Sequence, residues 1–460
     1  MTNITRVPSY PKICRKGDTG MSLFNPIDIL NHIIDEIVKD IKDYIENPET
    51  NGNCFTRKRV LDASTLIKFI IQMKGGTLDT ELYNSFVKQG INISAPALVQ
   101  RRRLLKAEIF QEILRRFNDT RPNEKLYKGY HIWAIDGSDF PLAPKKDSAY
   151  YMGSTKERYN GEISKAVSLL HGHFMYDVLN KQFIDCLTTP KKGEGCGERA
   201  AAVKMMYRNK SKKSVVIMDR GYIGFNTAEH CNRSGMKYII RADSKFAKEE
   251  LSELPDEPCF RRMKLFLSTK QTKENKAKKN FHWLNLAVTS WDFEDDYTLE
   301  FNVYKFKINE DGKDKWEILI TNLFPWDFRI DEMKELYHMR WGIETAFNAL
   351  KHAVGAINFH SYKDKYIEQE FYARLIFYNL AERIALNAVI QQKDTKYAYT
   401  VNFKMTCYIL HDSYDARFTR KIDEICRLIE NYVRPIRPGR KDKRRMRPKS
   451  PVSFVYRVAA

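Results

Sequence analysis

Hydrophobic positions recur at helical spacing through the first quarter of the chain. Between residues 26 and 48, isoleucine and leucine return every three or four positions, which predicts a helix with one buried face. Three further segments repeat this pattern, at residues 62–73, 78–89 and 94–118. We therefore predict a helical domain over residues 1–125. Its Arg101–Arg103 cluster suits a face that binds DNA, and a solvated basic surface is the alternative.

Strand-like runs replace the helical pattern after residue 129. Turn signals separate five runs of apolar, aromatic and β-branched residues, at residues 129–136, 166–178, 182–188, 214–218 and 236–241. Helical patterns at residues 197–209 and 225–234 lie between the later runs. Strands that alternate with helices are typical of an α/β sheet. We therefore predict an α/β domain over residues 126–362.

A basic segment interrupts this alternation of strands and helices. Residues 261–280 hold eight basic residues and one acidic residue, and the following pattern predicts antiparallel strands at residues 281–290 and 297–308. We interpret residues 244–315 as an inserted β subdomain with a basic edge. The next predicted strand, at residues 316–321, returns the chain to the main sheet.

The C-terminal part is predicted to be helical and to end in a basic tail. Apolar residues at helical spacing predict a helix at residues 366–391 within a helical region over residues 363–433. Residues 434–449 include nine basic residues, one acidic residue and three prolines, which predicts an extended tail over residues 434–460. We expect this tail to lie on phosphates, and a purely solubilising tail is the alternative.

The composition indicates a folded protein with a polyanionic partner. Hydrophobic residues make up 43% of the 460 residues, which excludes intrinsic disorder for most of the chain. Lysine and arginine number 78 against 58 aspartates and glutamates, so the formal net charge is +20. This surplus favours nucleic acid, because phosphates that bind to cationic side chains release their counterions. A basic protein without such a partner is the alternative.

Export, membrane insertion and zinc binding are not predicted. No run approaches eighteen consecutive apolar residues, and residues 1–18 lack the apolar core of a secretory signal. The eight cysteines do not follow zinc-finger spacing, and we expect them to be reduced in a cytoplasmic protein. Cys186 and Cys196 are one candidate metal-binding pair, with a structural role as the alternative.

Two aspartates stand where predicted strands end. Asp136 follows the run at residues 129–135, and Asp219 follows the apolar run at residues 214–218. The carboxyl ends of such strands face the crevice in which α/β sheets bind ligands. A buried carboxylate there needs a cation or metal ion to offset its desolvation. Each aspartate alone is equally compatible with an ordinary cap of a turn or helix.

A third acidic residue lies on a long predicted helix at residues 331–354. Within an arc of roughly 60° this helix carries four polar side chains, Tyr337, Arg340, Glu344 and Lys351. Its apolar residues occupy a separate arc, which predicts packing by one side only. A charged stripe is usually a solvated surface. If this helix packs beside the strand-end aspartates, Glu344 joins Asp136 and Asp219.

Three converging carboxylates in a basic protein favour magnesium chemistry on phosphates. Magnesium prefers hard oxygen ligands and is commonly held by a few carboxylates together with substrate oxygens. Two such ions about 4 Å apart clamp the attacking and leaving oxygens of a phosphodiester. Nearby cations, Arg340 and Lys351 among them, would offset the repulsion between these carboxylates and DNA.

These residues match the motifs of a known family. The pattern Tyr-x2-Arg-x3-Glu-x6-Lys is met in full on the predicted helix, and Asp136–Ser138 and Asp219–Tyr222 resemble the two other family blocks. The chain thus resembles the DDE transposases of bacterial insertion sequences, in the insertion-sequence-four group. The resemblance spans about residues 130–362. It implies an α/β, ribonuclease-H-like catalytic core with an inserted β subdomain, flanked by N-terminal and C-terminal helical regions.

The resemblance also implies a role for each motif residue. The acidic residues would be catalytic and would bind two Mg²⁺ ions per active site, with Mn²⁺ as a substitute: Asp136, Asp219 and Glu344. The other residues of the helix motif would contact phosphates at the transposon end: Tyr337, Arg340 and Lys351. Excision in this group passes through a DNA hairpin with one base flipped out of the duplex.

Three further residues are candidate DNA contacts on the same resemblance. Trp316 resembles the tryptophan on which the flipped base stacks, and a core tryptophan is the alternative. Arg220 and Tyr222 are the other two.

The resemblance implies double-stranded DNA partners, namely terminal inverted repeats and target DNA. The N-terminal helices would read the repeats, and the C-terminal helices would support a homodimer in a paired-end complex in the bacterial cytoplasm. Two other functions stay open: a catalytically inactive or domesticated DNA-binding relative, and a ribonuclease-H-fold nuclease without strand transfer. The full set of motif residues argues against the first, and the basic insertion with the signature helix argues against the second.

Overall fold

A computed structural model describes most of the chain, which folds into two compact units. The described residues are 25–51, 53–56, 59–121, 124–156, 163–191, 197–210, 213–284, 293, 295–310, 313–388, 397–414 and 420–437. One unit is built from the described parts of residues 1–109 and 376–451, and the other from those of residues 110–375. Cys196, residues 285–290 of one predicted strand and most of the basic tail lie outside the described residues.

The first unit is mainly helical, as the apolar spacing predicts. Its N-terminal elements are α1 (Pro26–Lys39), η1 (Ile41–Tyr44), α2 (Pro48–Asn51), α3 (Ala63–Gln72), α4 (Leu78–Ser85), η2 (Val87–Gln89) and α5 (Ala95–Arg102). It also contains α14 (Phe403–Ser413), α15 (Ile422–Glu430) and a small sheet of β11 (Tyr399–Val401) and β12 (Val433–Pro435). Asn25, Asp62, Thr77 and Ser94 cap four helix starts with their side chains, which explains where those helices begin. None of the helices within the described ranges is long and apolar enough to span a membrane.

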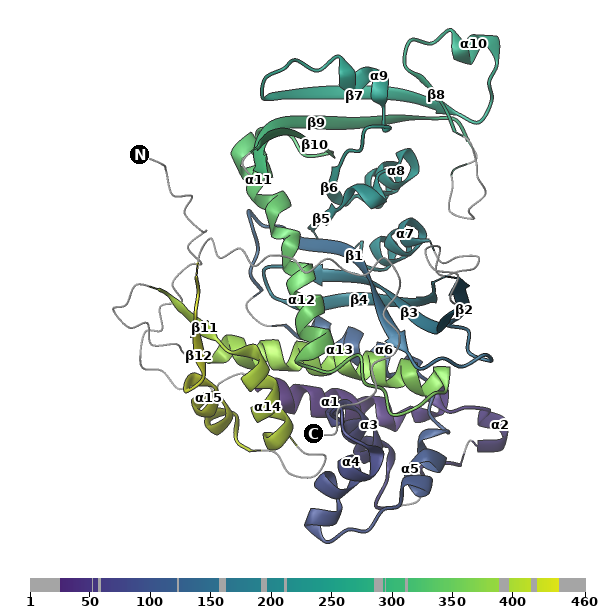
Figure 1. The fold of residues 1–460 in the computed structure, drawn as a ribbon, viewed down its shortest axis with the longest axis vertical. Coiled ribbons are helices and arrows are strands. Elements are labelled where there is room, and N and C mark those ends of the chain that lie inside the picture. Colours follow the sequence, from purple (N-terminus) through teal and green to yellow (C-terminus); the bar gives the residue numbers. More distant parts are fainter. Residues whose placement is uncertain are drawn as a thin grey trace. The chain divides into compact units, whose positions relative to one another are not determined.

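A ten-stranded mixed sheet forms the centre of the second unit (Figure 1). Its strands are β1 (His131–Leu142), β2 (Tyr151–Lys156), β3 (Ile163–Asp177), β4 (Gln182–Pro190), β5 (Ser214–Met218), β6 (Lys237–Arg241), β7 (Cys259–Ser268), β8 (Phe281–Trp283), β9 (Tyr297–Glu310) and β10 (Lys313–Thr321). Their order is β2-β3-β1-β5-β6-β10-β9-β7-β8, with β4 paired to β3. Strands β1, β5 and β6 run parallel to one another. This sheet with its flanking helices confirms the predicted α/β class.

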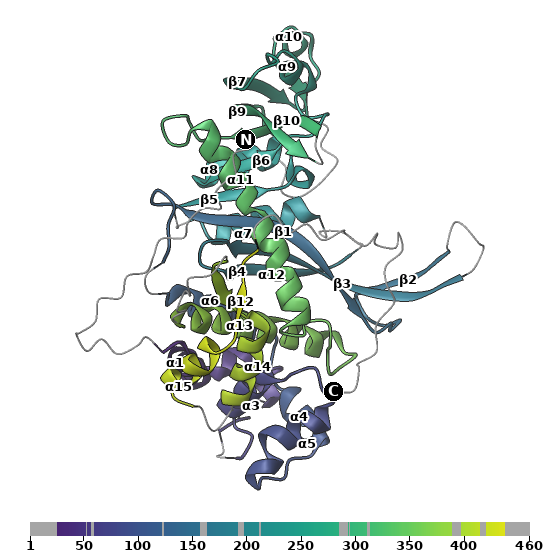
Figure 2. The ribbon, with the colours of Figure 1, turned by 60° about the vertical axis from the view of Figure 1, so that its left-hand side comes forward.

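Helices cover both faces of the sheet. On one face, α7 (Glu198–Arg208) and α8 (Phe225–Ser234) pack on apolar residues of β1, β5 and β6. On the other, α11 (Ile330–Met339) packs on the alternate residues of the same strands. Successive side chains of a strand point to opposite faces, so a residue's position in its strand decides which layer it enters. Figure 2 shows β2 and part of β3 extending as a ribbon away from the other strands.

Two features of the second unit differ from the sequence interpretation. Strands β7 to β9, interpreted as a subdomain, extend the central sheet, because β9 pairs with both β7 and β10. The helix predicted at residues 331–354 is divided at Arg340 into α11 and α12 (Trp341–His352). The Arg340 N–H donates to the Tyr337 carbonyl, as in a tight 3₁₀ turn, and this explains the division. Strand β2 and the short helices α9 (Lys248–Ser252) and α10 (Lys273–Lys276) were not predicted.

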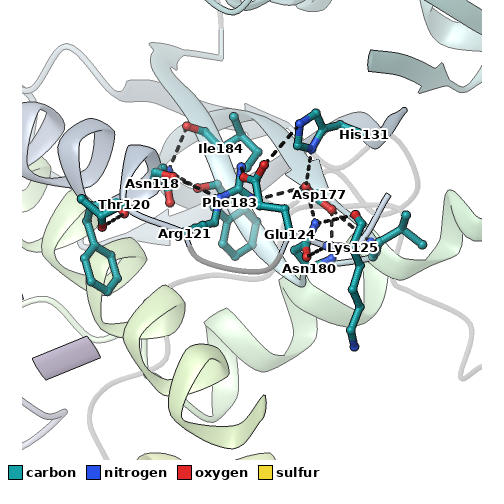
Figure 3. Close-up of polar contacts among 12 residues, drawn as sticks. Asn118, Thr120, Arg121, Glu124, Lys125, His131, Asp177, Asn180, Phe183 and Ile184 are labelled. Carbon is teal, nitrogen blue, oxygen red and sulfur yellow. Dashed lines mark hydrogen bonds and ion pairs between the residues drawn. The ribbon is translucent and has the colours of Figure 1, made fainter. Parts of the chain in front are cut away.

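A buried ionic network holds the start of β1 (Figure 3). Arg121, just after α6 (Glu108–Asp119), lies 3.2 Å from the Asp177 carboxylate and 2.7 Å from that of Glu124. His131, the first residue of β1, approaches the same Asp177 oxygen at 3.6 Å. The backbone N–H of Asn180 donates to the other oxygen, so the turn from β3 to β4 joins the network. These contacts tie α6, β1 and that turn together.

Candidate active site

Asp136 and Asp219 lie next to each other where the parallel pairing of β1 with β5 ends. Asp219 follows the end of β5 as predicted, but Asp136, predicted to end its strand, lies within β1, because β1 continues to Leu142 in its pairing with β3. Ile135 of β1 pairs with Met218 of β5 in the last step of their register, and the two aspartates directly follow this pair. Parallel strands present their carboxyl ends at the same edge of a sheet. By the alternation of side chains along each strand, both aspartates point toward the face that carries α11.

Arg340, at the junction of α11 and α12, joins two of the three predicted acidic residues. Its Nη1 lies 3.8 Å from Asp136 Oδ2, and its Nη2 donates to Glu344 Oε1 at 3.3 Å. The side chain is only 7% exposed. An arginine buried this deeply needs anionic partners. The division between the two helices therefore places a fixed positive charge between carboxylates that would otherwise repel one another.

Tyr337, the first residue of the helix motif, contacts the third carboxylate. Its hydroxyl donates to Asp219 Oδ1 at 3.4 Å. Burial, and then the negative charge of Asp219, raise the pKa of Tyr337, so the hydroxyl stays protonated as a hydrogen-bond donor. Tyr337 and Arg340 together contact all three acidic residues that the sequence selects.

The charge on Asp136 is only partly compensated. Burial raises the pKa of Asp136 to about 6, and the carboxylates of Glu344 and Asp219 contribute to the increase. The Gly137 N–H and the Arg340 guanidinium oppose this effect without cancelling it. A carboxyl group with so high a pKa gains from any additional cation nearby, since the cation favours its ionised form.

Lys351, the last residue of the motif, extends the site along β1. Its Nζ donates to Ser138 Oγ at 2.8 Å and lies 4.9 Å from the centre of the Phe140 ring. Ser138 is two residues beyond Asp136 and so points to the same face of the strand. All four residues of the helix motif thus lie beside the two aspartates or the adjoining residues of β1.

The structure does not place Trp316 in this group. In β10, Trp316 lies on the opposite face of the strand from Leu319 and on the same face as Ile318 and Ile320. Leu319 packs in the layer of α11, whereas Ile318 and Ile320 pack in the layer on the other side of the sheet. The Nζ atoms of Lys305 and Lys307 lie 4.6 and 5.1 Å from the centres of its rings. Trp316 is therefore a half-buried tryptophan in a basic setting on the other face of the sheet.

The two residues after Asp219 that the sequence also selects differ in exposure. Arg220 opens the turn η3 (Arg220–Tyr222) and is exposed, so a phosphate can reach it. Tyr222 is 1% exposed and packs in the layer that contains α7. Its burial leaves no surface for a DNA contact in this structure.

Sequence reasoning missed a second polar group beside Asp136. His171 of β3 has Nδ1 2.5 Å from Asp139 Oδ1 and Nε2 3.3 Å from Glu198 Oε1. Lys191 lies 3.0 Å from the same Asp139 oxygen. Burial opposes protonation of His171, but the Asp139 and Glu198 carboxylates outweigh it and raise the pKa of this histidine. Only the antiparallel register of β1 and β3, which sequence reading does not supply, brings Asp139 opposite His171.

The residues present suit a hard divalent cation in their chemistry. The carboxylates of Asp136, Asp219 and Glu344 are the oxygen donors that magnesium prefers. Burial is the main reason for the raised pKa of Asp136, and the nearby carboxylates of Glu344 and Asp219 add to it. In this structure Arg340 and Tyr337 hold these carboxylates. Across the described ranges, no three histidine, cysteine, aspartate or glutamate side chains form a group that could hold a metal ion. The kinds of donor atom at this site fit magnesium. The distances between the three carboxylates are those of groups that contact Arg340 and Tyr337, as described above.

Comparison with known proteins adds two findings. The family described as Transposase DDE domain matches residues 127–380. Among solved structures, a piggyBac transposase synaptic complex with hairpin DNA is similar to the chain, with 12% sequence identity and a TM-score of 0.45. That likeness covers 91% of this chain and 87% of the other. No curated protein matches.

Proposed function

Because the chain belongs to the Transposase DDE domain family, we propose that it is a cut-and-paste DNA transposase of the insertion-sequence-four group. A domain of this family implies a DNA-cleaving phosphoryl transferase. One observation supports the finer proposal: Arg340 contacts both Asp136 and Glu344, and Tyr337 of the same motif contacts Asp219. Lys351, the last motif residue, contacts Ser138 of β1. Three segments far apart in the sequence meet at this point: β1, β5 with the turn η3 that follows it, and α11 with α12.

The residues of the site divide into acidic ligands and phosphate contacts. Asp136, Asp219 and Glu344 would hold divalent metal ions, which supply Lewis-acid stabilisation of the phosphodiester and a more acidic bound water. Tyr337 orients Asp219 through its hydroxyl. Arg340 neutralises part of the carboxylate charge, so that a DNA phosphate can approach. Lys351 and exposed Arg220 lie on either side and suit contacts with the flanking phosphates.

The proposed partners are the ends of the element, a target duplex and a second copy of the chain. The net charge of +20 supports the first two, because cationic side chains bind the DNA backbone irrespective of sequence. The second copy is proposed because the resemblance to the insertion-sequence-four group implies a homodimer in a paired-end complex.

Two rival functions predict different products. An inactive or domesticated relative would bind the end duplex without cutting it, and a ribonuclease-H-fold nuclease would cut without joining. The purified chain should be incubated with a labelled end duplex, with flanking DNA and target plasmid, in Mg²⁺, Mn²⁺ or EDTA. Metal-dependent nicking at the boundary, then a hairpin and joined product, is the expected sequence. Binding without cleavage would favour the first rival, and nicking without hairpin or joining would favour the second.

Arg340→Ala is expected to weaken end binding and to reduce the salt slope. Removing one phosphate contact lowers the slope of log K against log salt by roughly 0.9. Binding is measured by fluorescence anisotropy from about 50 to 200 mM salt. Arg233→Ala, which removes an ion pair with Glu229 on α8, is the matched control and should keep the wild-type slope. An unchanged slope in Arg340→Ala would restrict Arg340 to its contacts with the carboxylates.

The base-stacking role is proposed for Trp316 on its resemblance, and the structure supplies a second candidate. Trp341 is 44% exposed, directly follows Arg340, and has the Arg340 guanidinium 5.0 Å from its ring. Alanine at the stacking residue is expected to slow hairpin formation about 5- to 150-fold more than first-strand nicking, because base stacking contributes about 1–3 kcal/mol. Rates of both steps in Trp316→Ala and Trp341→Ala decide between them. Equal effects on the two steps in both variants would remove this role from both residues.

A further inference from the structure

Glu198, the first residue of α7, lies against the backbone beside both aspartates, at Gly137 of β1 and at Gly221 in the turn after β5. A Cβ atom added at Gly137, next to Asp136, would lie 3.1 Å from Glu198 Oε1. A Cβ atom added at Gly221, two residues after Asp219, would lie 3.9 Å from Glu198 Oε2. The Glu198 carboxylate therefore lies between these two backbone positions, and the missing side chain at Gly137 leaves room for it.

A chain of polar contacts fixes the direction of this carboxylate. His171 holds Oε1 at 3.3 Å, Asp139 holds the other nitrogen of His171, and Lys191 holds Asp139. Neighbouring cations lower the pKa of Glu198, His171 first, so the carboxylate is ionised. His171 thus holds Oε1 of Glu198, and Oε2 is directed toward the turn after Asp219.

Tyr222, three residues after Asp219 in the turn η3, carries a second buried polar atom. It is 1% exposed, and its hydroxyl has no hydrogen-bond partner among the residues that the structure describes. Burial, and then the charges of Asp136, Glu198 and Asp219, raise the pKa of Tyr222 well above its usual range, so this hydroxyl lies within electrostatic reach of all three carboxylates. A buried hydroxyl without a partner costs free energy, and it is commonly satisfied by water or a ligand.

Building on the proposed function, we propose that Glu198 and Tyr222 bind the water molecules of a divalent cation held by Asp136 and Asp219. Magnesium keeps several of its waters when proteins bind it through one or two carboxylates. Those waters are hydrogen-bond donors and acceptors, which suits the open oxygen of Glu198 and the hydroxyl of Tyr222. His171 and Asp139 are positioning residues that act through Glu198.

This arrangement gives the cation two partners from each face of the sheet. Asp136 and Asp219 approach from the α11 face, and Glu198 and Tyr222 approach from the α7 face. Glu198 is an outer partner in this proposal, which is consistent with the lack of a closed metal-binding group among the residues described. Residues in such outer positions typically change metal affinity by about 10- to 100-fold when they are replaced.

The test is Mn²⁺ binding to the full chain without DNA, measured by electron paramagnetic resonance of free and bound Mn²⁺. Glu198→Gln is expected to raise the dissociation constant about tenfold. His171→Asn should do the same through loss of the Glu198 orientation, and Gly137→Ala should do so by displacing both side chains. Glu229→Gln on α8, in an ion pair with Arg233, is the matched control and should bind as wild type does. Thermal unfolding in EDTA verifies that each variant is folded.

The outcomes separate this inference from the proposed function. Wild-type affinity in folded Glu198→Gln and His171→Asn, with loss of binding in Asp219→Asn, would overturn the outer role alone. Absence of Mn²⁺ binding by the wild-type chain, or unchanged binding by Asp219→Asn, would overturn the proposed metal site and the outer role together. The number of water ligands on bound Mn²⁺, from pulsed resonance in ¹⁷O water, should be equal in wild type and Glu198→Gln. One extra water ligand in the variant would make Glu198 a direct ligand and overturn the outer role.

Discussion

Asp219→Asn is expected to reduce metal-dependent cleavage of an end duplex about a thousandfold or more, with binding of that duplex nearly unchanged. Asparagine keeps the size of the side chain and can still accept from Tyr337, but it loses the charge that would bind a cation. A metal ion stabilises a phosphoryl-transfer transition state by several kcal/mol, and each ~1.4 kcal/mol is tenfold in rate. The loss therefore falls on the chemical step.

The measurement is the single-turnover rate of first-strand nicking at saturating protein, with binding followed separately by mobility shift. Asp185→Asn is the matched control within the same unit. Asp185, on β4, has a carboxyl group whose pKa is raised to about 6 by burial. It forms an ion pair of 3.4 Å with Arg208 of α7. Its replacement should leave nicking within about threefold, since it does not touch a carboxylate of the site. Equal nicking by Asp219→Asn and wild type would contradict the assignment of Asp219.

Periodicity predicted the elements of the α/β core closely, because those elements are either fully buried or strongly amphipathic. The strand at residues 214–218 and the helix at residues 225–234 have the bounds that the pattern predicts. Pairing was harder to predict. The basic strands β7 to β9 look like a separate subdomain in sequence. Only the pairing of β9 with β10, and of β7 with β9, shows that they continue the sheet. Strand order depends on long-range contacts, which a local pattern does not contain.

The candidate site was predictable where one helix carries several of its residues. Spacing alone placed Arg340 and Glu344 on one side of a helix, and they contact each other as expected. Spacing does not place Trp316, because the face on which a strand residue lies depends on the register of β10 with its neighbours. For the same reason, the sequence did not identify Glu198 and His171 as residues of the site. They are ordinary polar residues in sequence, and they meet only through the pairing of β1 with β3 and the packing of α7.

Arg121→Ala is expected to destabilise the chain by about 3–5 kcal/mol, because it leaves a buried carboxylate without its cation. Asp177 is fully buried, and its ion-pair partner Arg121 is 5% exposed. Arg115→Ala is the control. That arginine pairs with Glu112 and Asp119 on the same helix but is 62% exposed, so its loss should cost less than about 1 kcal/mol. Urea unfolding at pH 7 gives both values, and similar costs in the two variants would contradict the prediction.

The pH dependence gives a second test of the same contact. Burial alone would raise the pKa of Asp177, but His131, Arg121 and Asn180 outweigh it, and the pKa lies below its ordinary value. A carboxyl group with a lowered pKa in the folded state stabilises that state above its unfolded pKa of about 3.9, and this contribution is lost as pH falls toward the folded pKa. The stability difference between wild type and Arg121→Ala should therefore be full at pH 7 and shrink below about pH 4. A difference that stays constant to pH 2 would show that Arg121 stabilises the start of β1 by packing rather than by charge. In that case the network would still hold the start of β1, the strand that carries Asp136, but its contribution to stability would not depend on the charge of Asp177.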